Sequence, residues 1–135
     1  MQPSITDIKV YGYLLDIFGH VNNARYLEFM EAGRWNFVEG KIDLIEWKRR
    51  GIAFTVVNIN INYRRPAVLG DILEIHTKMS DIVEKSATIR QEIFIKGTDT
   101  LIVDADVTFV MVDIRKKKAI IFPDNLRDSF LSMIE

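Results

Sequence analysis

The sequence predicts an α+β domain in which a curved antiparallel sheet of five or six strands wraps around one long central helix. Three observations support this fold class. The segment 24–38 is apolar on most of its helical surface, and a helix of that kind is enclosed by other structure. After residue 56, apolar and polar side chains alternate with a period of two. Short turns separate these alternating segments, so successive strands are expected to be antiparallel neighbours.

The composition is that of one globular domain spanning residues 1–135, with 48% apolar and 27% charged residues. A net charge of −1 provides no field that would recruit nucleic acid or a membrane surface. The absence of cysteine excludes disulfides, zinc–thiolate sites and thiol catalysis, and with two histidines we expect no metal site. No apolar run has the length of a signal peptide or the ~20 residues of a membrane helix, so a cytoplasmic protein is expected.

The N-terminal segment is expected to form a strand and then a loop. Residues 5–15 are assigned to the strand. Residues 16–23 contain Gly19 and two asparagines, which mark a loop. Asn22 or Asn23 is suited to cap the helix that follows, because its side-chain oxygen can accept a hydrogen bond from a free N–H of the first turn.

Two helices are expected next. The central helix covers residues 24–38, and Gly40 is suited to end it. A short amphipathic helix covers residues 43–50, with Asp43 near its start and Gly51 at its end.

The rest of the chain is expected to supply most of the sheet and a final helix. Four segments carry the alternation: residues 57–64, 73–79, 89–96 and 103–111. In the first of them, one face is expected to hold Val57, Ile59, Ile61 and Tyr63. A last strand near residues 119–122 precedes a helix that begins at Pro123-Asp124 and carries Leu126, Phe130 and Met133.

The segment 16–26, Asp-Ile-Phe-Gly-His-Val-Asn-Asn-Ala-Arg-Tyr, is the main functional signal. It gathers a carboxylate, an imidazole and two carboxamides just before the central helix. A helix start carries unpaired N–H groups and a partial positive charge. It can therefore hold an oxyanion while a nearby carboxylate activates a nucleophile, which is the geometry that acyl transfer requires.

The same segment resembles the hotdog-fold acyl-CoA thioesterases, in particular the 4-hydroxybenzoyl-CoA thioesterase-like family. The resemblance lies in Asp-x-x-Gly-His-Val-Asn-Asn-Ala-x-Tyr-Leu from residue 16, followed by Glu31-Ala32. The later run Tyr-Arg-Arg-Pro-Ala-Val-Leu-Gly-Asp, residues 63–71, is similar to a second landmark of that family. The expected order of strands and helices agrees over nearly the whole chain.

The resemblance implies a hotdog fold, with the curved sheet wrapped around the central helix. It also implies a homodimer or homotetramer whose active site lies at a subunit boundary. The substrate would be an acyl group carried by coenzyme A or by acyl carrier protein. No metal or redox cofactor is implied.

The resemblance also assigns catalytic residues. Asp16 is expected to act as general base or as nucleophile, and both roles stay open. The backbone N–H of Asn23 is expected to donate to the thioester oxygen. His20 could orient Asp16, bind the acyl carbonyl or bridge groups of the loop. Glu31 is a further base or nucleophile, unless it forms only an ion pair with Arg34 one turn along the helix.

Substrate contacts are expected from five further residues: Gly19, Asn22, Tyr26, Arg64 and Arg65. The two arginines suit coenzyme A phosphates, since a guanidinium binds phosphate through two parallel hydrogen bonds. The basic run 115–118 could clamp the nucleotide 3′-phosphate, although a solvated turn that discourages edge pairing is the preferred interpretation.

The predicted activity is hydrolysis of an acyl-CoA thioester to a free acid and coenzyme A. The acyl chain is expected in an apolar pocket near Phe18, Phe29 and Phe54. One alternative is a hotdog hydratase or dehydratase that uses His20 and Glu31 as an acid–base pair. A second alternative is a module that binds acyl-CoA without turnover.

Overall fold

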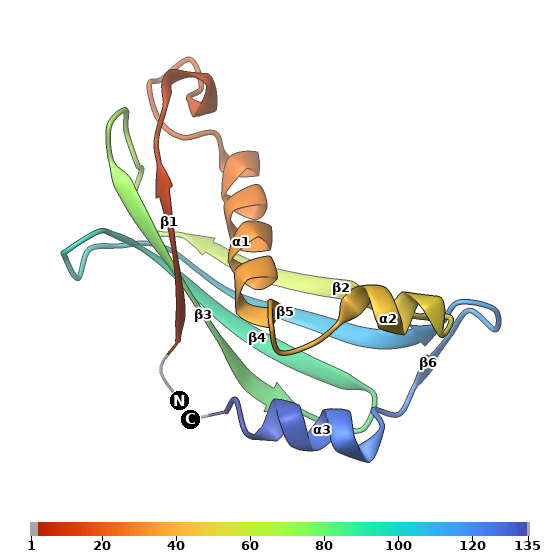
Figure 1. The fold of residues 1–135 in the computed structure, drawn as a ribbon. Helices are drawn as coiled ribbons and strands as arrows, with labels where there is room; N and C mark the ends of the chain where they lie inside the picture. Colours follow the sequence, from red (N-terminus) through yellow and green to blue (C-terminus); the bar gives the residue numbers. More distant parts are fainter. Residues whose placement is uncertain (1–2, 135) are drawn as a thin grey trace.

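The sheet has six strands, all paired antiparallel, in a computed structural model that describes residues 3–134 (Figure 1). The strand order is β1-β3-β4-β5-β2, and β6 pairs with the end of β5. The bounds of the strands are β1 Ser4–Lys9, β2 Ile52–Tyr63, β3 Ile72–Ile82, β4 Ser86–Ile95, β5 Leu101–Asp113 and β6 Lys118–Ile120. The predicted fold class is confirmed.

Helix α1 (Asn23–Val38) lies on one face of the sheet and contacts mainly β1 and β3 (Figure 1). The short α2 (Leu44–Arg49) packs against β2, and α3 (Asp124–Leu131) packs against β3. None of these helices is long and apolar enough to cross a bilayer, within the described part of the chain. The expected bounds of all three helices agree with the structure to within a few residues.

One flank of α1 is open, in contrast to the prediction of an enclosed helix. The buried side of the helix carries Tyr26, Phe29, Met30, Gly33 and Phe37. Leu27 and Trp35, on the other side, remain exposed. The apolar periodicity therefore identified the helix, but it did not show which of its apolar residues face the sheet.

The helix is tied to the sheet by a small polar cluster. Gln91 is fully buried, and its Nε2 donates to the Met30 carbonyl at 2.8 Å and to Thr77 Oγ1 at 2.9 Å. A Cβ on Gly33 would lie 2.7 Å from the Ile75 side chain. Glycine at this position lets α1 approach the sheet closely enough for these bonds to form.

Two strand predictions were wrong at their ends. Strand β1 stops at Lys9, because its partner β3 begins at the paired residue Ile72. The chain then forms a 3₁₀ turn over Gly12–Leu14, where a strand was expected. In β2, a β-bulge at Val57 shifts the alternation. Ile59 and Ile61 face the core as predicted, whereas Val57 is exposed.

Strands β2 and β3 are not neighbours, which corrects the expectation drawn from their short connection. β2 pairs with β5 and forms one edge of the sheet, and residues 64–71 cross from β2 to β3. The crossing segment is held beside the loop that precedes α1: Val21 N–H donates to the Ala67 carbonyl at 2.9 Å, and His20 bridges to Val68. This crossing places the two functional segments side by side.

Candidate active site

The loop before α1 fixes the carboxylate of Asp16. Its Oδ1 accepts hydrogen bonds from the backbone N–H groups of Phe18 at 2.8 Å and His20 at 3.2 Å. The backbone closes the same turn, since Asp16 N–H donates to the His20 carbonyl at 2.8 Å. Gly19 has a φ of +77°, a conformation that glycine adopts without strain. Among residues 3–134, nothing donates to the second carboxylate oxygen, Oδ2, which is available for chemistry.

The start of α1 presents a free donor. Asn22 is the N-cap, and its side-chain oxygen accepts from Ala24 N–H at 2.9 Å, as the sequence predicted. Asn23 is the first helical residue. Its own N–H has no acceptor in the described chain. This N–H therefore lies at the positive end of the helix dipole and is available to a ligand.

Tyr26 of α1 connects the crossing segment 64–71 to the site. The Tyr26 hydroxyl accepts from Ala67 N–H at 3.2 Å, and its ring packs 5.8 Å from that of Tyr63. Burial raises the pKa of Tyr26, so its hydroxyl stays protonated. Its position indicates that Tyr26 supports the wall of the site.

These segments enclose a cavity of about 200 Å³ at the N-terminal end of α1, which we name the polar cavity. It is lined by Asp16, His20, Val21, Asn23, Tyr26, Tyr63, Arg64, Arg65 and Pro66. The polar cavity thus brings together most of the predicted site residues. Gly19 and Asn22 lie in the supporting turn and cap, and do not line it. Val21, Tyr63 and Pro66 belong to the two resembling motifs but were not assigned to the site, because their place in it depends on the strand crossing.

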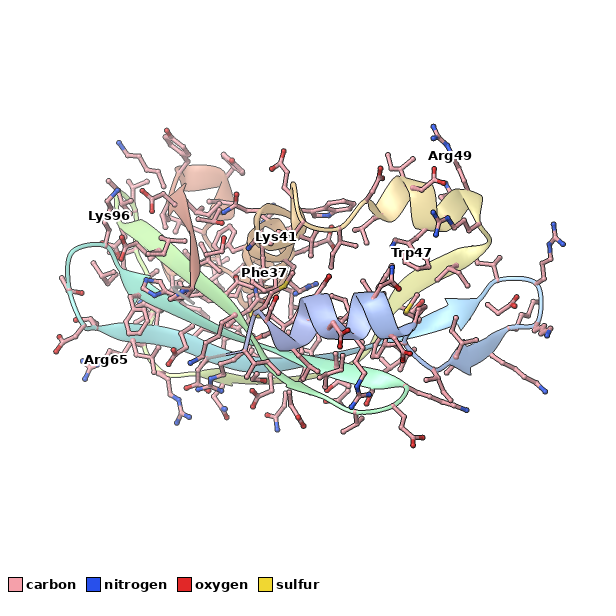
Figure 2. All side chains as sticks on the ribbon, turned by 60° about the horizontal axis from the view of Figure 1, so that its bottom comes forward. Phe37, Lys41, Trp47, Arg49, Arg65 and Lys96 are labelled. Carbon is pink, nitrogen blue, oxygen red and sulfur yellow. The ribbon has the colours of Figure 1, made fainter. Side chains whose placement is uncertain are left out.

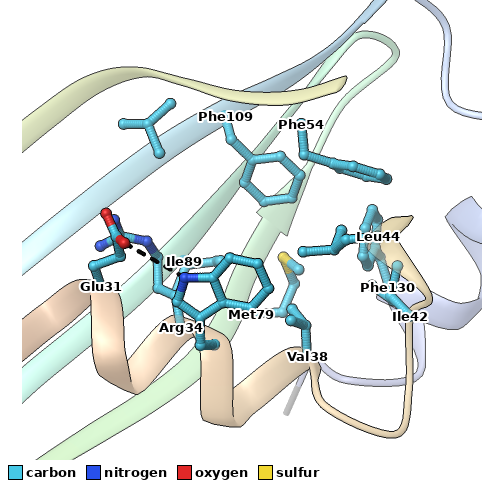
Figure 3. Close-up of a pocket in the computed structure, with 12 residues that line it drawn as sticks. Glu31, Arg34, Val38, Ile42, Leu44, Phe54, Met79, Ile89, Phe109 and Phe130 are labelled. Atoms are coloured by element: carbon cyan, nitrogen blue, oxygen red, sulfur yellow. Dashed lines mark hydrogen bonds between the residues drawn. The ribbon is translucent and has the colours of Figure 1, made fainter. Parts of the chain in front are cut away.

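Glu31 is the predicted site residue that lies elsewhere. It is exposed two turns along α1 and lines a second cavity (Figure 3). Its Oε2 accepts from Trp35 Nε1 at 3.4 Å. Arg34 donates to Gln91 Oε1 at 3.1 Å, whereas the alternative left open for Glu31 was an ion pair with Arg34. Burial lowers the pKa of Arg34, and the nearby Glu31 partly offsets this shift. Within one chain, His20 and Glu31 therefore face different cavities.

The second cavity, of about 250 Å³, lies along the open flank of α1, and we name it the apolar cavity (Figure 3). Its lining is mostly hydrophobic and includes Val38, Leu44, Phe54, Val56, Met79 and Phe109. Of the three phenylalanines expected near an acyl pocket, only Phe54 lines this cavity. Phe29 is buried in the core, and Phe18 is 77% exposed on the loop.

Arg64 forms an ion pair with Asp104, whose carboxylate is nearly buried. Its Nε donates to Asp104 Oδ2 at 2.7 Å, and Asn62 donates to Asp104 Oδ1 at 2.9 Å. The bond from Arg64 holds the pKa of Asp104 below its ordinary value, although burial acts in the opposite direction. The alternation placed Asp104 on the outer face of the sheet. Its contact with Arg64 required the pairing of β2 with β5, which the sequence did not predict.

The basic run 115–118 lies in the turn between β5 and β6, where the sequence predicted a hairpin turn. Asp113 Oδ1 accepts from the backbone N–H groups of Arg115 and Lys116, both at 3.0 Å. Asp104 and the polar cavity lie near the other end of β5. Within one chain, this basic turn does not adjoin the polar cavity.

Comparisons with known proteins agree on one family. The family model of the thioesterase-like superfamily matches residues 12–130. The chain is 45% identical to the long-chain acyl-CoA thioesterase FadM of Escherichia coli, over 96% of this chain and 98% of that protein. It is 31% identical to the acyl-CoA thioesterase YbgC of Haemophilus influenzae, over 91% and 90% of the two chains. The crystal structure of the YbaW probable thioesterase from Escherichia coli superimposes with a TM-score of 0.87 at 44% identity, over 98% and 99% of the chains.

Proposed function

The chain belongs to the thioesterase-like superfamily, and from this premise we propose that it hydrolyses acyl-CoA thioesters to free acids and coenzyme A. One observation carries the proposal. A carboxylate with a free oxygen, Asp16, and a free helix N–H, Asn23, line the same small cavity. This pair supplies the two groups that acyl transfer from a thioester requires.

The Asn23 N–H binds the thioester oxygen in this mechanism. Negative charge develops on that oxygen as the carbonyl carbon is attacked, and the helix dipole adds to the stabilisation. One such donor is worth about 3 kcal/mol of the activation barrier. The thiolate is a fair leaving group, so it needs no strong acid to protonate it.

Asp16 serves either of two routes. As general base, it takes a proton from water, and the resulting hydroxide attacks the thioester carbon and expels the thiolate. As nucleophile, its Oδ2 forms a mixed anhydride with the acyl group and expels the thiolate, and water then cleaves the anhydride. A single turnover in ¹⁸O-labelled water can demonstrate the nucleophilic route, because only that route leaves label in the Asp16 carboxylate, when water attacks the anhydride at the Asp16 carboxyl carbon.

His20 supports Asp16 mainly through its backbone. Its N–H and its carbonyl both bond to Asp16, which keeps the carboxylate at the mouth of the helix. The imidazole lines the polar cavity, where it can contact the thioester or the departing sulfur. The bonds to Asp16 involve only the backbone of His20, so the three roles that the sequence left open for its imidazole stay predictions.

The free edge of β2 favours a homodimer, alone or as half of a homotetramer. A long unpaired edge strand is a template for pairing with a second copy, and a twofold axis makes that pairing antiparallel. Phe54 and Val56 lie near the start of β2, and Tyr63 ends it. Pairing centred on the middle of β2 therefore brings the polar cavity of one copy toward the apolar cavity of the other.

The apolar cavity is the site proposed for the acyl chain. Its hydrophobic lining and its place beside the β2 edge suit an acyl group that enters from the partner's polar cavity. FadM is named as a long-chain acyl-CoA thioesterase, which agrees with a dedicated apolar chamber. The identity of the thiol carrier, coenzyme A or acyl carrier protein, is decided by comparing the same acyl group on both.

The proposal is tested by release of free thiol from acyl-CoA. Asp16→Asn keeps the shape of the side chain and removes the base or nucleophile, so turnover should fall at least ~10²-fold with the melting temperature nearly unchanged. Asp113→Asn is the matched control, because Asp113 Oδ1 also accepts two backbone N–H groups but lies at the far turn. Equal turnover for the Asp16 variant and the native protein would refute the proposal.

A further inference from the structure

Asp104 is a nearly buried carboxylate on the outer face of the sheet, away from α1. Its side chain is 4% exposed, yet it lies among charged neighbours rather than in the apolar core. Besides the bonds from Arg64 and Asn62, Arg90 NH2 approaches its Oδ1 to 3.7 Å. A buried carboxylate is costly unless paired, so these contacts account for its burial and fix the position of its partners.

Arg64 is held by this carboxylate through Nε alone. Its two terminal nitrogens have no acceptor among residues 3–134. The next residue, Arg65, donates its backbone N–H to the Ile102 carbonyl, and its guanidinium has no acceptor in the same part of the chain. Figure 2 shows Arg65 at one end of the molecule, pointing away from it, with Arg49 of α2 at the other end. Two guanidinium groups are thus available at this end.

The two arginines separate two hollows. On one side they line the polar cavity that holds Asp16 and Asn23. On the other side they line an outer hollow of about 500 Å³, together with Asp99, Thr100, Leu101 and Asp104. Asp104 lies between Arg64 and Arg90, so its charge is divided between two guanidinium groups, and Asp99 is the other carboxylate that lines the outer hollow.

We propose that the outer hollow is the subsite for the phosphate-bearing nucleotide end of coenzyme A, with Asp104 as the positioning residue that holds Arg64 at its wall. The inference rests on the proposed function: Arg64 and Arg65 line both hollows, so a carrier whose thioester lies in the polar cavity can extend past them into the outer hollow. The free nitrogens of a guanidinium bind phosphate oxygens in a bidentate manner. Anchoring Arg64 through Nε leaves those nitrogens ordered before the ligand arrives, which lowers the entropic cost of binding.

The first test compares two thiol carriers with the same acyl group: coenzyme A and N-acetylcysteamine, which has no phosphate. Arg64→Gln should raise KM for acyl-CoA about tenfold, and because Arg64 also lines the polar cavity, the comparison is with its smaller effect on the N-acetylcysteamine reaction. Asp104→Asn should raise the same KM about threefold, because a neutral amide orients Arg64 less firmly. Asp106→Asn is the matched control: Asp106 lies on the same face of β5 and pairs with Arg90, so neither reaction should change.

A second readout does not depend on turnover. Titration calorimetry should show that adenosine 3′,5′-bisphosphate binds the native protein. Its affinity should be lower for Arg64→Gln and Asp104→Asn, and unchanged for Asp106→Asn. In an Arg64→Gln background, Asp104→Asn should have no further effect, because a positioning residue acts only through its partner. Arg64 is exposed and its variant is expected to fold, so the test stands even if Asp104→Asn is unstable.

Three results would overturn the inference. The first is an equal loss of activity with acyl-CoA and with the N-acetylcysteamine thioester, and the second is an effect of Asp104→Asn that persists in the Arg64→Gln background. The third is an effect seen only with acyl carrier protein thioesters. Intact hydrolysis without bisphosphate binding would remove this inference alone. Bisphosphate binding that depends on Arg64, in a protein that cleaves no thioester, would remove the proposed function and leave the nucleotide subsite.

Discussion

The polar and apolar cavities use the same helix in different ways. The polar cavity meets the end of α1, where a free N–H, a fixed carboxylate and two arginines converge. The apolar cavity lies along the side of α1, where Val38 and Trp35 face Phe54 and Phe109 across an open flank. The end of a helix supplies polarity and its side supplies an apolar wall, so one element can serve both halves of an acyl thioester.

Strand order produces this difference. Because β2 is an edge strand, residues 64–71 must cross to β3, and they pass the N-terminal end of α1. Because α1 contacts mainly β1 and β3, it does not cover the inner face near β2, and the space between α1, α2 and this face forms the apolar cavity. A single crossing connection therefore builds one cavity and leaves the other open.

Filling the apolar cavity should separate its role from that of the polar cavity. Leu44→Trp places an indole in its wall, and we expect kcat/KM for long-chain acyl-CoA to fall at least ~10-fold, with acetyl-CoA affected far less. Ile45→Trp is the control, because Ile45 is 63% exposed and does not line this cavity. Equal losses on long and short chains would show that the two cavities do not divide the substrate as proposed.

Mixed dimers extend this prediction to the subunit arrangement. If the acyl chain crosses to the partner, a dimer of Asp16→Asn with Leu44→Trp keeps one complete site. An equal mixture should then recover about a quarter of the native long-chain activity, since half of the dimers are mixed and each has one good site of two. No recovery after verified exchange of subunits would place both cavities of a site in one chain.

Substitution of Glu31 is expected to have the smallest effect, and it tests directly whether the apolar cavity takes part in the chemistry. It lines the apolar cavity and is bonded to Trp35, so Glu31→Gln should change turnover less than about threefold. Steady-state kinetics with a long-chain acyl-CoA measures this. A loss as large as that of Asp16→Asn would mean that a partner's Glu31 reaches the thioester, and the apolar cavity would then carry chemistry.

The sequence predicted the local parts of the site better than their assembly. The Asn22 cap, the start of α1 and the turn at Asp16 depend on neighbours in the chain, and the patterns around them were sufficient. The contact of Arg64 with Asp104 joins residues 40 positions apart and depends on β2 pairing with β5. Short connections suggested that β2 and β3 are neighbours, because turn length alone does not distinguish a hairpin from a crossing.

The acyl pocket shows a second limit of sequence patterns. Phe18, Phe29 and Phe54 are equally apolar, yet one is exposed, one is in the core and one lines the apolar cavity. The bulge at Val57 and the close approach at Gly33 decide which side chains face which space. Both are tertiary features, and neither changes the local alternation enough to be recognised.

Replacement of Asn23 by proline tests the central claim most directly. Proline at the first helical position, where it is well tolerated, replaces the backbone N–H with its ring Cδ, and Asn22 already has the extended backbone that precedes proline. Asn23→Ala keeps that N–H and serves as the control. We expect kcat to fall about 10²-fold for Asn23→Pro and to change little for Asn23→Ala, with both proteins folded. Equal kcat values for the two variants would contradict it.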